Sequence, residues 1–281
     1  MAFLDRIREC NAHEISRFRP FRVAGQRIGW VRHDLADLLS GFDKVFSITP
    51  ESVVLREEIG GFDARSAAMA EVLAVLREEG MVPAWRDESY PVVRRFGDES
   101  LLRMERAGVP VFGIRAFGVH MNGFVRRGNG IEMWIARRSR NKPTFPGMLD
   151  NTVAGGQPFG LTLAENLVKE CGEEASIPPE LAVRATPVGA VSYMAAVEEG
   201  LKPDVQYCFD LELPADFTPR PNDDEIEEFY LWPIEKVAEI VRETAEFKFN
   251  CNLVLIDFLI RHGLIGPESP DYIDIVHGLR Q

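Results

Sequence analysis

The stretch that decides the fold runs from Met148 to Ala175 and reads MLDNTVAGGQPFGLTLAENLVKECGEEA. It begins with a short β-rich run that ends in a glycine-rich loop. Thr162 and Glu165 have the spacing of a capping box, in which hydroxyl and carboxylate satisfy backbone N–H groups that the start of a helix leaves unpaired. The stretch therefore predicts a strand, a tight loop and a helix over residues 163–175.

The predicted helix has an apolar face. Leu163, Leu167 and Cys171 recur every four residues and are expected to pack inward. The prolines at 178 and 179 cannot continue a helix, so it is expected to end just beyond Ile177.

Glu170, Glu173 and Glu174 project to another side of the same helix, because residues three and four apart are neighbours on its surface. Like charges this close destabilise an isolated helix, which favours a hard divalent cation shared by the carboxylates. Mg²⁺ fits, with Mn²⁺ as a second candidate, because all the ligands are oxygen. The alternative is a solvated acidic face in a chain with 44 acidic residues, but the preceding glycine loop favours the metal.

The composition limits the classes of protein. The chain has 281 residues, of which 46% are hydrophobic, enough for one large core or two modest ones. The net charge of -12 at pH 7 argues against a general nucleic-acid binder, because a surface that follows phosphates needs an excess of basic residues. Small anionic substrates stay open, through a bound cation and a local basic patch.

Cysteine spacing and hydropathy indicate the compartment. The four cysteines are far apart and form no CxxC pair, which predicts buried, reduced thiols. No stretch approaches the ~20 apolar residues that a membrane span requires. The sequence thus predicts a soluble cytoplasmic protein that binds neither membranes nor nucleic acid.

The first part of the chain is expected to form a small α+β unit. Apolar positions over Ala64–Glu79, opened by Asp63 as N-cap and ended by Gly80, predict an amphipathic helix. Short β-rich runs, broken by glycine and proline, are expected at residues 21–31, 45–55 and 90–96. Gly108 and Pro110 interrupt both periodicities, so we expect an accessory domain over residues 1–108 and a second domain over residues 109–281.

In the second part, strand and helix patterns interleave, which indicates a mixed α/β arrangement. Strands are expected at residues 111–126, 131–136, 188–193 and 205–213, and helices at residues 163–175, 234–243 and 252–262. Apolar and polar residues alternate from Val205 to Leu213, so one face of that strand is expected to meet a core.

Residues 155–177 resemble the Nudix box. The family pattern is a Gly, five residues, Glu, seven residues, Arg-Glu, an aliphatic residue, any residue, Glu-Glu, any residue, Gly and an aliphatic residue. The matching positions are Gly155, Glu170, Glu173, Glu174 and Ile177, while Cys171 fills the aliphatic place and Lys169 stands where Arg is usual. Leu161 replaces the first Glu and Ser176 replaces the second Gly.

A closer resemblance is to the Nudix proteins related to thiamine pyrophosphokinase, which carry an additional N-terminal domain and a box with Lys-Glu-Cys in the middle. Four further segments of this chain resemble that group, and they begin at Phe112, Trp134, Pro146 and Asp257. The resemblance implies a Nudix α/β/α sandwich preceded by a small α+β domain. It also implies Mg²⁺-dependent hydrolysis of an organic diphosphate, thiamine diphosphate or an oxidised analogue, to the monophosphate and phosphate.

Roles in metal binding and catalysis follow from this resemblance. Glu170, Glu173 and Glu174 are expected to bind the metal with the Gly155 carbonyl, and Glu173 or Glu174 to double as the base for the attacking water. Glu225 lies in an acidic segment where Nudix proteins often place a base, and a solvated loop is the alternative there.

Further residues are candidates for binding the substrate. Gly156 lets the backbone approach the phosphates closely, and an ordinary glycine turn is the alternative. Arg137 and Arg138 offer forked donors to phosphate oxygens, or else serve solubility. His120 and Asn122 offer directional donors and acceptors to a heterocycle, or else are structural.

Two other functions stay open from the sequence. Isomerisation of an isoprenoid diphosphate would need a reactive cysteine, but Cys171 is expected on the packed side of the helix. A diphosphate sensor without turnover is favoured by Leu161 in place of Glu. The accessory domain could supply a substrate lid, a specificity wall or a homodimer contact.

Overall fold

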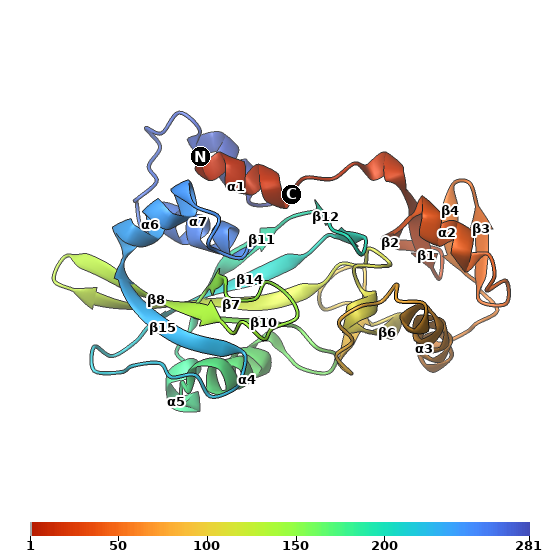
Figure 1. Cartoon of the computed structure of the whole chain (residues 1–281), viewed down its shortest axis with the longest axis horizontal. Coiled ribbons are helices and arrows are strands. Elements are labelled where there is room, and N and C mark those ends of the chain that lie inside the picture. The colour runs from red at the N-terminus through yellow and green to blue at the C-terminus, as the bar shows by residue number, and fades with distance from the viewer. Residues whose placement is uncertain (1) are drawn as a thin grey trace.

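A mixed sheet of seven strands organises the computed structural model, which describes residues 2–281 (Figure 1). Five strands run in the order β11-β14-β7-β8-β15, while β9 pairs with β8 and β10 pairs with β7. The bounds are Phe117–Arg127 for β7, Gly130–Arg138 for β8, Leu149–Asp150 for β9, Val153–Gly156 for β10, Thr186–Ser192 for β11, Val205–Glu212 for β14 and Ile226–Pro233 for β15. β14 runs parallel to β7, and the other neighbours are antiparallel.

The two short strands, β9 and β10, lie where β7 and β8 separate from each other. β7 and β8 pair from Phe124 and Met133 to their connecting turn, and β10 and β9 take over beyond those residues. The chain therefore leaves the middle of the sheet at Gly156, and the glycine-rich loop lies where the two long strands have separated.

Helices cover both faces of the sheet (Figure 1). One face carries α4 (Leu163–Ala175) and α5 (Pro179–Ala182). The other carries a layer formed by α1 (Phe3–Cys10), α6 (Ile234–Glu243), α7 (Cys251–Arg261) and α8 (Tyr272–Gly278). A separate apolar core lies under each layer, so the expected α/β/α sandwich is present.

β14 is buried more completely than its alternating pattern predicts. Cys208 packs into the core beneath α7, whereas Phe209 and Leu211 pack into the core beneath α4. The predicted face does meet a core, and the opposite face is covered as well because β14 is an inner strand between β11 and β7. Its polar positions are accommodated by partners, as for Asp210, which pairs with Arg261.

Residues before the main sheet form a second, four-stranded sheet in the order β2-β1-β4-β3. The bounds are Phe18–Val23 for β1, Gln26–Arg32 for β2, Phe46–Thr49 for β3 and Ser52–Leu55 for β4. Helices α2 (His33–Leu39) and α3 (Phe62–Glu78) and the hairpin of β5 (Ser89–Val92) and β6 (Leu102–Glu105) accompany it. A ribbon of β12 (Ala195–Ala196) and β13 (Leu201–Lys202) lies apart. The elements from β1 to β6 share their own apolar core, which extends to Ile114.

Helix α3 confirms the predicted amphipathic helix with a shifted start. Gly61 is its N-cap residue and Asp63 lies in the first turn, so the assignment of Asp63 as N-cap was wrong. Gly80 has a φ of 76°, a left-handed conformation that glycine adopts without steric cost, and it ends the helix as expected.

Two strand predictions need correction, and one strand was not predicted. The run at 21–31 is a hairpin whose turn, Ala24-Gly25, has positive φ at both residues. The strand expected from residue 111 begins at Phe117, because Val109–Ile114 folds back through backbone turns. The acidic segment that contains Glu225 leads directly into β15, whose charged outer positions concealed the strand pattern.

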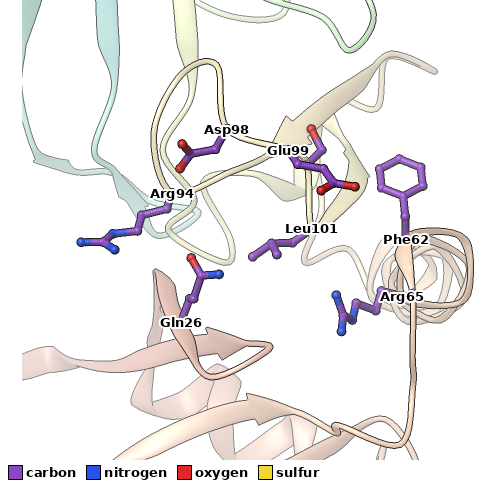
Figure 2. A pocket seen from close by; sticks show the side chains of 9 residues that line it. Gln26, Phe62, Arg65, Arg94, Asp98, Glu99 and Leu101 are labelled. Atoms are coloured by element: carbon purple, nitrogen blue, oxygen red, sulfur yellow. The ribbon is translucent and has the colours of Figure 1, made fainter.

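A cavity of about 450 Å³ lies among the N-terminal elements (Figure 2). Gln26 of β2 and Arg65 of α3 point into it from opposite walls, and Arg94, Asp98 and Glu99 approach from the loop between β5 and β6. Its lining lacks the candidate metal-binding glutamates, so this cavity is distinct from the glycine loop.

The first helix packs with the last ones. Arg6 is buried on α1 and donates from Nε to the Val241 carbonyl at 2.9 Å. A Cβ placed on Gly278 would lie 2.5 Å from Cγ2 of Ile7, which shows how closely α1 and α8 approach. The N-terminal segment thus joins the core of the C-terminal helices, while the division of the chain at residue 108 stays a prediction.

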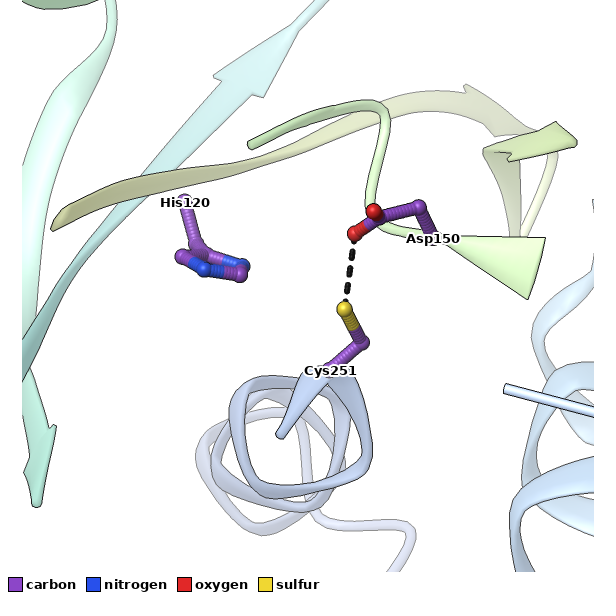
Figure 3. Close-up of side chains that lie close together, drawn as sticks. All are labelled: His120, Asp150 and Cys251. Carbon is purple, nitrogen blue, oxygen red and sulfur yellow. Dashed lines mark hydrogen bonds between the residues drawn. The ribbon is translucent and has the colours of Figure 1, made fainter. Parts of the chain in front are cut away.

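A buried polar network lies between the sheet and α7 (Figure 3). His120 Nδ1 lies 2.8 Å from Asn151 Oδ1, and the Cys251 thiol donates to Asp150 at 2.7 Å. Arg138 forms an ion pair of 2.8 Å with Asp150. Burial lowers the pKa of His120 to about 4, so the imidazole is neutral in the folded protein at pH 7.

All four cysteines are buried and unpaired, as predicted. Within residues 2–281, no helix combines the length and the hydropathy needed to cross a bilayer.

We expect Gly29→Ala to lower the free energy of unfolding by about 1–3 kcal/mol, as overpacking does in well-packed cores. A Cβ at Gly29 would lie 2.3 Å from the Phe112 carbonyl oxygen, where the backbone has no room to move. Urea denaturation followed by tryptophan fluorescence measures the change. Gly60→Ala is the control, since that position has open space, and equal midpoints for both variants would contradict the prediction.

Low pH should destabilise the folded protein because burial disfavours the protonated form of His120. Its pKa is about 4 in the folded state and near 6.5 when unfolded, so the unfolded chain binds the extra proton as pH falls. We expect a loss of about 2 kcal/mol between pH 7 and pH 5 from this group. Urea denaturation of the wild type and of His120→Gln at both pH values checks it, and an identical pH dependence would refute the assignment.

Candidate active site

The glycine loop leads into α4 through the predicted capping box. The Thr162 hydroxyl accepts from the Glu165 backbone N–H at 3.2 Å, and a Glu165 carboxylate oxygen accepts from the Thr162 N–H at 2.9 Å. The helix begins at Leu163, as predicted, and its last residue is Ala175. Its direction is therefore set beside the loop, and Leu167 and Cys171 face the core.

Helix α4 ends differently from the expectation. Ser176 takes a left-handed conformation with a φ of 52°, and its hydroxyl donates to the Arg220 carbonyl at 2.9 Å. The prolines then belong to the next helix, α5, in which Pro179 is the first residue. The glycine usual at position 176 in the family pattern would suit this conformation without strain.

Glu170 lies directly against Gly155. A Cβ at Gly155 would be 2.2 Å from Cδ of Glu170, so any side chain there would displace the carboxylate. The Glu170 side chain is 12% exposed, with Lys169 Nζ at 3.3 Å. Burial raises the pKa of Glu170 above its ordinary value, against the opposing charge of Lys169.

Glu174 is buried one turn further along α4. It accepts a hydrogen bond of 2.8 Å from the Ala154 N–H of β10, which ties the helix to the strand. Burial and the charges of Glu170 and Asp150 raise its pKa well above the ordinary value. Two carboxylates thus share a buried site at the end of β10, where their negative charges oppose each other.

Glu173 points differently from the other two glutamates. Its side chain is 49% exposed, and it lies 2.6 Å from Lys169 Nζ. Within residues 2–281, one group of three potential metal ligands has its ligand atoms within 4.8 Å of one another, and it consists of His120, Asp150 and Cys251. The structure therefore brings Glu170 and Glu174 to the loop and leaves Glu173 on the solvent side.

The glycine loop fits a hard divalent cation better than the buried trio does. Glu170 and Glu174 offer only oxygen donors, and a cation between them would offset the cost of burying their charges, which raises both pKa values. In the trio, Asp150 already pairs with Arg138 and accepts from the Cys251 thiol (Figure 3). Lys248 lies 3.8 Å from the same carboxylate, so cations of the protein occupy its surroundings.

Gly156 borders the loop on the side of the N-terminal elements. A Cβ there would lie 1.5 Å from the Tyr90 hydroxyl and 3.6 Å from Cζ of Arg106. Its carbonyl accepts from the side chain of Asn166 on α4 at 2.9 Å. Tyr90 lies on β5 and Arg106 follows β6, and no local pattern in the sequence indicates that this hairpin reaches the loop.

The two arginines that end β8 are engaged within the protein. Arg138 is buried and donates to the carbonyls of Thr144 and Phe145 as well as to Asp150. Arg137 donates to the Tyr230 hydroxyl at 2.9 Å and to the Gly147 carbonyl at 2.8 Å. These contacts use their forked donors, so the structure gives no support to the prediction that Arg137 and Arg138 bind phosphate.

His120 and Asn122 are also occupied. His120 is 3% exposed and Asn122 is 0% exposed, so neither side chain is accessible to a substrate. Asn122 accepts from Asn151 and donates to Asp210, each at 3.1 Å. Their arrangement is that of structural polar residues.

Glu225 lies beside Lys142, with which it forms an ion pair. Burial acts to raise the pKa of Glu225, but the hydrogen bond and charge of Lys142 prevail and lower it. A carboxylate with a lowered pKa is a weaker base, so this pairing does not favour Glu225 as the catalytic base.

Comparison with known proteins gives several matches. A family model described as "Domain of unknown function (DUF4743)" matches residues 2–116. Nudix hydrolase 20, chloroplastic, from Arabidopsis thaliana is 42% identical over 289 residues, which cover 99% of this chain and 77% of the plant protein. Nudix hydrolase 24, chloroplastic, from the same plant is 42% identical over 282 residues, with 99% of this chain and 77% of the plant protein covered.

Among solved structures, DR0079 from Deinococcus radiodurans is 24% identical, with 59% of this chain and 97% of that chain covered and a TM-score of 0.44. The family assignment rests on the plant relatives, whose 42% identity extends over 99% of this chain. The segment from Gly155 to Ile177 lies within that alignment. This chain belongs to the Nudix hydrolase family.

Proposed function

We propose that this hydrolase cleaves the phosphoanhydride bond of an organic diphosphate with the help of Mg²⁺, to give the monophosphate and phosphate. The observation that carries the proposal is a pair of carboxylates at the glycine loop: Glu170, which is 12% exposed and packs against Gly155, and Glu174, which is buried and accepts from the Ala154 N–H. Such a pair is costly to bury unless a cation neutralises it. Mn²⁺ would suit the same oxygen donors.

Each residue of the site has a role in this proposal. Glu170 and Glu174 would hold the cation with the Gly155 carbonyl, and the cation would neutralise phosphoryl oxygens and lower the pKa of water. Glu173 is the base that we favour, because its carboxylate reaches solvent, whereas that of Glu174 is buried and tied to the Ala154 N–H.

The chemical step needs few protein groups. Water attacks phosphorus, the anhydride P–O bond breaks, and the proton of the water passes to the Glu173 carboxylate. Lys169 orients this carboxylate through its 2.6 Å contact. The phosphate and the organic monophosphate leave as separate products, and Glu173 returns its proton to solvent.

Thiamine diphosphate or an oxidised analogue is the substrate that we propose. Two features support this choice: Lys169-Glu170-Cys171 in the box, and an N-terminal region like that of the thiamine pyrophosphokinase-related group. A cytoplasmic location is also part of the proposal, whereas both plant relatives are named as chloroplastic.

The two alternative functions, isomerase and sensor, differ in the support that they have. Isomerisation through Cys171 has no support, because this thiol is fully buried and burial raises its pKa to about 12. A diphosphate sensor keeps one supporting observation, since Leu161 offers no carboxylate where the family pattern has its first Glu. Phosphate release from thiamine diphosphate with Mg²⁺ separates a hydrolase from a sensor.

We expect Glu174→Gln and Glu173→Gln each to lower kcat by about 100- to 1,000-fold, because each removes a charge from the site at little steric cost. Phosphate release under saturating substrate measures the effect. Glu180→Gln, at an exposed glutamate on α5, is the control and should keep full activity. Unchanged kcat in both site variants would defeat the assignment.

Removal of divalent metal should abolish turnover, and Mg²⁺ or Mn²⁺ should restore it. Because a ligand that binds only the folded state stabilises it, metal should also raise the melting temperature of the wild type more than that of Glu170→Gln. Calorimetry with and without a chelator records the shift. Turnover that persists in the chelator, with no metal-dependent shift, would rule out the proposed site.

A further inference from the structure

The hairpin of β5 and β6 is docked on the glycine loop. The Phe159 N–H donates to the Ser89 carbonyl at 2.8 Å, and the Tyr90 hydroxyl lies over Gly156. Phe62, at the start of α3, stacks on Phe159 with ring centroids 5.5 Å apart. Elements that precede residue 109 therefore form one side of the loop that leads to Glu170.

Arg106 follows β6 at this junction and is held in place from two directions. Its backbone N–H donates to the Glu88 carbonyl at 2.8 Å, and its Nη1 donates to the Glu88 carboxylate at 2.9 Å. The guanidinium lies 5.5 Å from the centre of the Tyr90 ring, within the range of a cation–π contact. Tyr90 and Glu88 thus orient the guanidinium next to Gly156.

The guanidinium of Arg106 keeps free donors. Its side chain is 45% exposed, and within residues 2–281 Nε and Nη2 have no hydrogen-bond partner. Protein groups accept from Nε, Nη1 and Nη2 of Arg138 and from Nε and Nη1 of Arg137, whose side chain is also less exposed, at 25%. Arg106 is thus the better placed arginine for a ligand at the loop.

Arg106 and Glu170 lie at neighbouring glycines of the loop. The Arg106 guanidinium is beside Gly156, and Glu170 of α4 packs against Gly155. A diphosphate at the glycine loop would therefore lie between a cation held by the glutamates and the guanidinium of Arg106. Such a ligand has more negative charge than one divalent ion neutralises.

We propose that Arg106, oriented by Glu88 and Tyr90, binds phosphoryl oxygens of the substrate, so that the N-terminal region completes the active site. This inference rests on the proposed hydrolase function. Arginine suits the task because its planar fork can donate two parallel hydrogen bonds to one phosphate group, which lysine cannot reproduce.

The test uses the full-length protein with thiamine diphosphate and Mg²⁺. We expect Arg106→Ala to lower kcat/KM by about 10- to 100-fold, chiefly through KM, which is the usual cost of a lost charged hydrogen bond. Arg106→Lys should recover only part of it. Arg103→Ala removes an exposed arginine of the same hairpin and should match the wild type.

A binding measurement separates this inference from the hydrolase proposal. Calorimetric titration with inorganic pyrophosphate and Mg²⁺ should show about 10- to 100-fold weaker binding to Arg106→Ala than to Arg103→Ala. If the wild type releases no phosphate from any organic diphosphate, the hydrolase proposal fails, whatever the titration shows. If the wild type is active and Arg106→Ala matches Arg103→Ala in KM and in pyrophosphate affinity, the role of Arg106 is overturned.

Discussion

The close approach of Glu170 to Gly155 is the constraint on which the site depends. It requires a residue without a side chain in β10, a helix that begins at Leu163, and a turn that brings this helix back over the strand. Glu174 then reaches the N–H of Ala154 from the next turn of α4. Strand, loop and helix are thus held in one geometry. A cation bound there would neutralise the two carboxylates and offset the cost of burying them.

Sequence patterns could predict the elements whose signals are local. The capping box at Thr162 and the four-residue apolar spacing define α4, and they define which helix face is buried. α6 has the predicted bounds for the same reason. β15 was missed because the acidic residues of an edge strand that faces solvent hide its alternation. α1 was missed because its apolar residues are few and its partners lie at the other end of the chain.

The candidate site shows the same distinction. The spacing of the glutamates identifies them as one group, but it cannot show that Glu173 turns to Lys169 while Glu174 turns to the backbone. Other candidate site residues are already paired within the protein. Arg138 pairs with Asp150, and Glu225 pairs with Lys142. The environment of Gly156 depends on a hairpin more than 50 residues upstream, which no local motif reveals.

The position of α1 affects how the protein is made and how it comes apart. This helix precedes most of the fold in the chain, yet the groups that bury Arg6 and Ile7 belong to α6 and α8, more than 200 residues later. The core of that layer therefore closes only after α6 and α8 have been synthesised. A single protease nick near residue 109 would also leave two fragments that stay associated, because the N-terminal fragment keeps a helix embedded in its partner.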